Sequence, residues 1–190
     1  MRADAGATRA RIVAAARTEF AAYGLAGARV DRISANASAS KERLYAYFGD
    51  KESLFAAAVA DGFARFADAV PFTVDDLGQF AARVYRHLCS EPEEHRILLW
   101  AQLQQASCLQ GDDTIGGVLD ARAAEVAQAQ RNGTLNADVA AEDLMTLLFG
   151  IVSAWLTTPG QMAVSSDAEL DRRCRVIESA VRRLCEVRTD

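Results

Sequence analysis

Apolar residues recur at helical spacing along almost the whole chain, and this periodicity restricts what the chain can fold into. Near the amino terminus Ile12, Ala16, Phe20 and Tyr23 follow one another by four, four and three positions, and Gly24 stands where a helix can end. Only three prolines and twelve glycines occur among 190 residues, so few positions interrupt long helices. The sequence therefore predicts an all-α fold.

The same pattern, together with residues that begin or end helices, predicts where each helix lies. After a helix at about 8–23, a second is expected at about 31–37, and the hydroxyl of Ser40 can cap a third that ends before Gly49. A fourth runs from Lys51 to Pro71. The remaining helices are predicted at about 74–89, 92–109, 113–131, 139–157 and 167–187. We expect about nine helices, in a three-helix head over residues 1–50 and a larger domain over 51–190.

Charge is divided unevenly along the chain. Residues 1–51 contain nine Lys and Arg against five Asp and Glu, whereas residues 52–190 contain twelve against twenty-one. The overall net charge of -5 hides this difference. A basic amino-terminal end on an acidic body indicates a head that meets a polyanion such as DNA.

The segment from Val30 to Lys51 has the layout of a helix-turn-helix: a short helix, a turn of small residues and a second helix. In this motif the first turn of the second helix meets base edges in the major groove. Arg43 can donate two hydrogen bonds to guanine, and Lys41 can reach a base or a phosphate. Donors suited to phosphates stand on the flanks at Tyr45, Tyr47 and Lys51. Taken singly, each of these residues could equally belong to a solvated rim.

Taken together, these residues resemble the helix-turn-helix of the tetracycline-repressor (TetR) family. The matching positions are Tyr23-Gly24, Ile33-Ser34, Ser38-Ala39-Ser40, Leu44-Tyr45, Tyr47-Phe48 and Lys51-Glu52. The resemblance covers about residues 8–60, with weaker support from Asn132-Gly133-Thr134-Leu135 before Asp138. It implies a dimeric, sequence-specific DNA-binding transcriptional regulator. The expected activity is that of a repressor, which a small-molecule effector releases from a palindromic DNA operator.

Three positions depart from the family pattern. Ser38 replaces the usual turn glycine, so a left-handed backbone there would carry strain unless the turn has shifted. Glu42 and Arg43 replace a Gly and a Thr or Ser, which predicts an atypical operator. Arg29 stands where the family often has a small hydroxyl residue against a phosphate. We include Arg29 and Ser40 among the DNA-binding candidates.

The resemblance also implies an effector pocket in the carboxy-terminal helices. Candidate lining residues are mostly apolar with a few polar tips, which favours an apolar or aromatic effector. They are Tyr85, Leu88, Trp100, Leu103, Gln104, Cys108, Met145, Phe149 and Val152. Each of them could also be plain core.

The last two predicted helices carry apolar stripes that suit helix-helix packing between two chains. One stripe comprises Leu144, Leu148, Ile151 and Trp155, and the other comprises Leu170, Cys174, Ile177, Val181 and Leu184. We predict a homodimer in which these helices form a four-helix bundle. The alternative is that both stripes are intramolecular core.

The sequence offers little for a membrane, a metal site or catalysis. The most apolar stretch, Leu144 to Leu156, is shorter than the ~20 residues that span a bilayer, and no signal-peptide pattern precedes it. The four cysteines lack CxxC spacing, which suits reduced thiols in the cytoplasm. We therefore expect a cytoplasmic protein with no membrane contact.

Potential metal ligands gather around Pro92, at His87, Cys89, Glu91, Glu94 and His95. We interpret them as a solvated helix junction, because the proline breaks the helix that would hold a fixed ligand pair. No metal or other cofactor is predicted, and the absence of catalytic motifs predicts that the protein is not an enzyme. Two alternatives remain: a helical small-molecule-binding or catalytic bundle without DNA readout, and a nucleoid-type DNA-binding protein without an effector.

Overall fold

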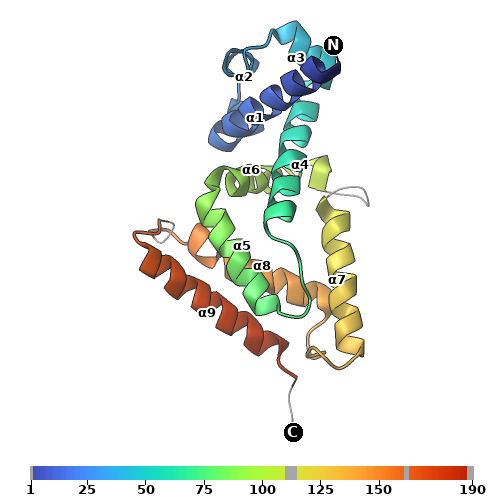
Figure 1. The fold of residues 1–190 in the computed structure, drawn as a ribbon, viewed down its shortest axis with the longest axis vertical. Helices are drawn as coiled ribbons and strands as arrows, with labels where there is room; N and C mark the ends of the chain where they lie inside the picture. Colours follow the sequence, from blue (N-terminus) through green and yellow to red (C-terminus); the bar gives the residue numbers. More distant parts are fainter. Residues whose placement is uncertain (1, 110–114, 161–162, 188–190) are drawn as a thin grey trace. The chain divides into compact units, whose positions relative to one another are not determined.

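The computed structural model describes residues 2–109, 115–160 and 163–187, and over these residues the chain is helical without strands (Figure 1). The all-α prediction is confirmed. The helices of the described residues are α1 (Arg2–Gly27), α2 (Val30–Asn36), α3 (Lys41–Phe48), α4 (Lys51–Ala69), α5 (Leu77–Ser90), α6 (Pro92–Leu103), the 3-10 helix η1 (Ser107–Leu109), α7 (Ile115–Arg131), α8 (Ala141–Thr157) and α9 (Asp167–Cys185).

Most helix ends lie within a few residues of their predicted positions, and the two largest differences are at the start of α1, which begins at Arg2 instead of about residue 8, and at the end of α6. This helix ends at Leu103 instead of continuing to residue 109. Gln105 then adopts a left-handed φ of 48°, which no continuous helix allows, and η1 follows. The predicted start of the seventh helix at residue 113 lies outside the described residues.

The chain divides into two compact units. The first consists of Met1–Phe66 and Glu91–Gly116, and the second of Ala67–Ser90 and Gly117–Asp190. Helix α6 thus belongs to the same unit as the helix-turn-helix. The domain boundary predicted at residue 50 stays a prediction, and α4 begins directly after it.

The first unit is organised around the apolar face of α1. Ile12 and Phe20 are fully buried there, as the helical spacing predicts, and Ile33 of α2 and Leu44 of α3 are equally buried. The ring of Phe20 meets Phe55 of α4 edge to face, with centroids 5.0 Å apart. These contacts hold the two short helices of the head against two long ones.

Gly24 allows α1 to approach α6 closely. Its φ of 63° and ψ of -178° interrupt the helical geometry of α1, and this region of backbone space is open to glycine almost alone. A Cβ at this position would lie 2.8 Å from the ring of Trp100 on α6. The sequence prediction that helical geometry stops at Gly24 is confirmed, and the structure adds a steric reason for the glycine.

In the second unit α5 packs along α9, and the two helices are antiparallel (Figure 1). Ion pairs fix both ends of this contact: Asp76 pairs with Arg182 at 2.8 Å, and Arg86 pairs with Asp171 at 2.6 Å. Between α5 and α9 the guanidinium of the buried Arg173 donates to the Tyr85 hydroxyl at 3.0 Å. Helix α8 packs against both of them.

Candidate nucleic-acid interface

A buried carboxylate, that of Glu19, fixes the corner between α1 and α2. Only 5% of this residue is exposed. Its carboxylate accepts hydrogen bonds from the Arg29 backbone N–H at 2.8 Å and from Arg32 Nε at 2.8 and 3.0 Å. The Arg32 guanidinium in turn lies over the Tyr23 ring, 4.4 Å from its centroid. The first turn of α2 is therefore anchored to α1 by charge as well as by packing.

The pKa of Glu19 reflects two opposing effects. Burial raises this pKa, but the hydrogen bonds from Arg32 and from the Arg29 backbone outweigh burial and leave the pKa below its usual value. The carboxylate is therefore charged at neutral pH. Sequence analysis missed this residue, although a clear signal existed: Glu19 stands between Ala16 and Tyr23 at helical spacing on the apolar face.

The turn between α2 and α3 is a Schellman motif with Ser38 at its left-handed position. The Ala39 N–H donates to Ser34 O at 3.0 Å and the Ser38 N–H donates to Ala35 O at 3.1 Å, the two hydrogen bonds that define this motif. Ser38 has a φ of 49°, as expected from its place where the family has glycine. The turn has not shifted to avoid the strain.

Helix α3 begins directly after this turn with the predicted cap. The Arg43 N–H donates to Ser40 Oγ at 3.2 Å, so Ser40 is the N-cap residue. Leu44 and Phe48 are buried and hold the helix to the head. The Arg9 guanidinium lies 5.2 Å from the centroid of the Phe48 ring, a contact between α1 and α3 that sequence analysis did not anticipate.

The predicted DNA-binding side chains of α3 are all exposed. They are Lys41, Arg43, Tyr45 and Tyr47, accompanied by Glu42. Lys41 forms an ion pair with Asp31 of α2. The pKa of Glu42 is lowered by hydrogen bonds from its own backbone N–H and from Ser40.

The two remaining candidates lie at helix amino termini. Arg29 is the exposed N-cap residue of α2, and its own side chain makes no capping hydrogen bond. Lys51 is the first residue of α4 and is half-buried. Asp50 precedes it and accepts the Ser53 N–H at 2.6 Å, as a capping residue does. All seven candidates therefore lie in the first unit, at or near the ends of the motif's helices or on α3.

Comparison with known proteins identifies the family. Residues 12–58 match the model of bacterial regulatory proteins of the tetR family, and residues 76–183 match the tetracyclin repressor-like C-terminal domain. The chain belongs to the TetR family of bacterial transcriptional regulators. It is thus a DNA-binding regulator with an amino-terminal helix-turn-helix and a helical carboxy-terminal domain.

Two relatives extend over nearly the whole chain. The HTH-type transcriptional repressor SCO4008 of Streptomyces coelicolor is 33% identical over 187 residues, which cover 96% of this chain and 97% of the relative. The HTH-type transcriptional repressor AcnR of Corynebacterium diphtheriae is 28% identical and matches 92% of this chain and 91% of its own length. The crystal structure of SCO4942 of Streptomyces coelicolor, described as a transcriptional regulator, superposes with a TM-score of 0.79. It is 31% identical and covers 94% of this chain and 98% of its own.

The residues expected to form the TetR-family dimer interface lie largely inside the second unit. Leu144, Leu148, Cys174, Ile177 and Val181 are buried by their own chain, and Ile151, Trp155, Leu170 and Leu184 are half-buried. Helix α5 covers the apolar seam of α9. For the buried residues this arrangement fits the intramolecular alternative within one chain. The dimer itself stays a prediction.

The residues expected to line an effector pocket divide between the two units. The second unit contains Tyr85, Leu88, Met145, Phe149 and Val152, and the first contains Trp100, Leu103, Gln104 and Cys108. In the second unit Tyr85, Met145 and Val152 are buried, whereas 77% of Leu103 is exposed in the first. The pocket stays a prediction.

Two further observations concern metals and membranes. Within the described ranges no three His, Cys, Asp or Glu side chains gather as a metal site would need. His87 and Cys89 belong to the second unit, whereas Glu91, Glu94 and His95 belong to the first. In the same part of the chain no helix combines the length and apolar character needed to cross a membrane.

We expect Glu19→Gln to lower the free energy of unfolding by about 1–3 kcal/mol at pH 7, because Arg32 loses its charged partner in a buried setting. A carboxyl group with a lowered pKa in the folded state stabilises the fold above its unfolded pKa, near 4.5. That contribution is lost as the pH falls through the folded value. The difference between wild type and variant should therefore be largest at neutral pH and shrink below about pH 4.5.

Denaturant unfolding of both proteins across this pH range measures the effect. Glu52→Gln is the matched control, because Glu52 is exposed in the same unit. A difference between wild type and Glu19→Gln that stays constant from neutral to acid pH would show that the charge of Glu19 has no part in holding α2.

Proposed function

We propose that this TetR-family regulator is a repressor that binds a palindromic DNA operator as a dimer and leaves it when a small molecule binds. The observation that carries the proposal is the set of exposed basic and aromatic side chains on α3, a helix that the buried Leu44 and Phe48 hold to the head. The name of the 33% identical relative, a transcriptional repressor, supports the sign of regulation. The basic balance of residues 1–51 supports a polyanionic partner.

Within this proposal Arg43 reads bases, and residues at the helix ends hold phosphates. Arg43 lies in the first turn of α3, where a recognition helix meets base edges, and its side chain is exposed. Its backbone is fixed by the hydrogen bond to Ser40. Lys51 lies at the start of α4, where the helix dipole also favours an anion. Direct readout and backbone contact are thus assigned to different residues.

We expect Arg43→Ala to weaken binding to the operator selectively, because a bidentate contact with guanine contributes roughly 1–3 kcal/mol of discrimination. This corresponds to a loss of about 5- to 150-fold in Kd on the operator and a much smaller loss on scrambled DNA. Lys51→Ala should weaken both about equally and lower the log-log salt slope by about one per lost phosphate contact in each head.

Selection of bound duplexes from a random pool supplies the operator, and titration over a salt series measures each variant. Arg131→Ala is the control, because Arg131 is an exposed arginine at the end of α7. If Arg43→Ala lowers the affinity for operator and for scrambled DNA by the same factor, Arg43 belongs with the phosphate contacts. If wild type selects no preferred sequence, the proposed operator function fails.

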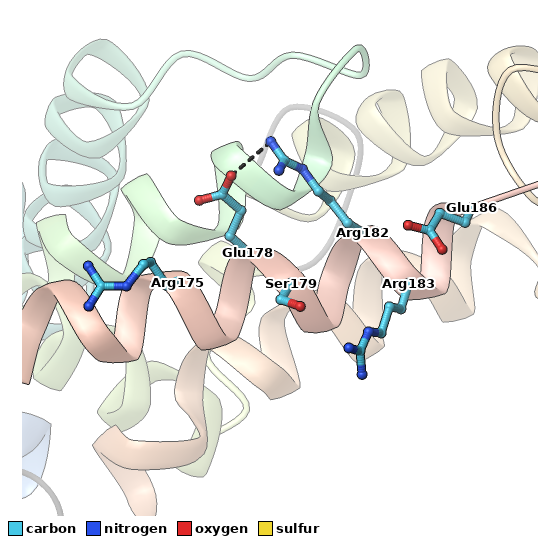
Figure 2. Close-up of a pocket in the computed structure, with 6 residues that line it drawn as sticks. All are labelled: Arg175, Glu178, Ser179, Arg182, Arg183 and Glu186. Atoms are coloured by element: carbon cyan, nitrogen blue, oxygen red, sulfur yellow. Dashed lines mark ion pairs between the residues drawn. The ribbon is translucent and has the colours of Figure 1, made fainter.

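The proposed dimer uses the outer faces of α8 and α9, because their inner faces are already covered. Leu147 of α8 and Val176 of α9 are each 46% exposed although they are apolar. A pocket of mixed charge along α9 is lined by Arg175, Glu178, Ser179, Arg182, Arg183 and Glu186 (Figure 2). Within it Arg182 pairs with Glu178, and it also reaches Asp76 beside α5. Residues of both signs on one helix face suit pairing with an antiparallel copy of the same helix, as in an isologous interface.

We expect Val176→Asp to shift the protein from dimer to monomer, because a charge would be buried without a partner at the interface. Truncations at interface centres cost about 2–4 kcal/mol, which predicts a roughly 30- to 1,000-fold rise in the dimer Kd and a parallel loss of operator binding. Sedimentation equilibrium measures the first effect and titration with the operator measures the second.

Val118→Asp is the matched control, because Val118 is also an exposed valine of the second unit but lies on α7. It should leave the dimer intact. A monomeric wild type at micromolar concentration would contradict the proposed dimer. An equal rise of the dimer Kd in Val176→Asp and Val118→Asp would contradict the placement of the interface on α9.

We further propose that the effector is apolar or aromatic and binds between α5 and α8, among the predicted lining residues of the second unit. Tyr85 on α5 and Met145, Phe149 and Val152 on α8 supply apolar surface, and the two helices pack together. A ligand can release DNA only if its affinity differs between the DNA-bound and DNA-free states. Release therefore requires weaker effector binding to the operator complex.

We expect a compound from a panel of aromatic and other apolar metabolites to bind, with an affinity about 5- to 150-fold lower in the presence of operator. Calorimetry with and without operator measures both values. Phe149→Ala should weaken this binding, whereas Val118→Ala, a truncation on α7, should not. Equal affinity with and without DNA would remove the allosteric claim and leave only a binding site.

A further inference from the structure

Lys41, the first residue of the recognition helix, is held by a carboxylate of its own chain. Asp31, in the first turn of α2, forms an ion pair with the Lys41 ammonium group. The hydrogen bond from Lys41 to Asp31 raises the pKa of Lys41 above its usual value, followed in size by the attraction between the two charges. The ion pair joins the beginnings of the two helices of the motif.

Both partners face solvent, Asp31 in the first turn of α2 and Lys41 at the start of α3. Their side chains are 54% and 68% exposed, so neither is part of the core. Arg43, two residues after Lys41, is exposed on the same first turn of α3. A phosphate that approaches Lys41 in this region meets the carboxylate of Asp31 as well.

The position of Lys41 explains why it keeps such a partner. The amino terminus of a helix carries a partial positive charge, so a cation in the first turn is unfavourable and a carboxylate nearby offsets it. A DNA phosphate can take over the same role, since it is also an anion at a helix amino terminus. Asp31 and a phosphate therefore compete for one ammonium group.

We propose that Asp31 is a specificity-determining residue, which competes with DNA phosphates for Lys41 and so weakens binding to arbitrary DNA more than binding to the operator. Binding to arbitrary DNA consists almost entirely of phosphate contacts, many of which long, flexible lysines can make in any register. Asp31 removes Lys41 from that set. At the operator, base contacts fix the register of α3, and binding depends less on a freely reaching lysine.

The exchange of partners also changes the expected salt dependence. As long as Lys41 stays paired with Asp31, it neutralises no phosphate and releases no counterion from DNA. Lys41 therefore adds almost nothing to the log-log salt slope of wild type. Without the carboxylate the same contact should add about one to the slope for each head.

The test compares wild type, Asp31→Asn, Lys41→Met and the double variant on operator and scrambled duplexes over a salt series. We expect Asp31→Asn to raise affinity for scrambled DNA roughly two- to fivefold, the range of exposed ion pairs. Affinity for the operator should rise less, so the specificity ratio falls, and the salt slope on scrambled DNA should steepen by about one per head. In the Lys41→Met background the Asp31→Asn effect should vanish, because the competition needs the lysine.

The control Glu52→Gln removes another exposed carboxylate of the same unit without touching this pair. Glu52→Gln should change the affinity for the operator and for the scrambled duplex by the same factor. The inference is overturned if Asp31→Asn behaves like Glu52→Gln, or if its effect persists in the Lys41→Met background. The inference rests on the proposed operator binding, and the two fail differently: a wild type without sequence preference overturns operator binding, whereas a selective wild type unaffected by Asp31→Asn overturns only the role of Asp31.

Discussion

The DNA-binding head depends on the buried carboxylate of Glu19. A charge in the interior is strongly unfavourable unless it is paired and hydrogen-bonded, and here the partners are the Arg29 backbone and the Arg32 side chain. Both partners stand at the beginning of α2, a helix of seven residues that is too short to be stable alone. The position of α2 is therefore set by tertiary contacts with α1, and the turn that follows α2 sets where α3 begins.

The strain at Ser38 is tolerated because its surroundings determine the backbone on both sides. A non-glycine residue in the left-handed region costs of order 1 kcal/mol and persists only where neighbouring contacts outweigh that cost. Before the turn, Ile33 and Ala37 are buried; after it, the cap by Ser40 and the burial of Leu44 fix the start of α3. Two hydrogen bonds within the turn complete this arrangement. The contacts that position the recognition helix α3 are thus the same ones that hold Ser38 in its strained conformation.

The local structure at helix ends could be predicted from the sequence. Which element packs against which could not. The break in α1 at Gly24 and the cap by Ser40 follow from the preferences of single residues at helix ends, whereas a left-handed Ser38 was suggested only by the glycine that the family has at that position. The apolar stripe of α9 was also predicted correctly from its spacing. That spacing is the same whether α5 or a second chain covers the stripe, so the sequence did not show which of them does. The structure assigns the buried part of the seam to α5.

Charge partners were unpredictable for the same reason. Asp31 and Lys41 are ten positions apart and on different helices, so no helical spacing links them. Glu19 was detectable as a carboxylate on an apolar face, but its partner Arg32 was not. The membership of α6 in the unit of the head also depends on a contact between Gly24 and Trp100 that no local rule contains.

These internal pairs change how the charge of the head should be interpreted. Residues 1–51 contain nine cationic side chains, but Arg17, Arg32 and Lys41 are held by carboxylates of the same unit, at Asp61, Glu19 and Asp31. At most six are then left to attract phosphates, so the count of nine cationic side chains overstates the pull on arbitrary DNA. A head with fewer available cations has a weaker sequence-independent attraction, and base contacts then make up a larger share of its binding energy. Internal ion pairs in a basic head thereby raise the ratio of operator affinity to non-specific affinity at the expense of overall affinity for DNA. A regulator needs this ratio because its operator competes with a genome of other sites.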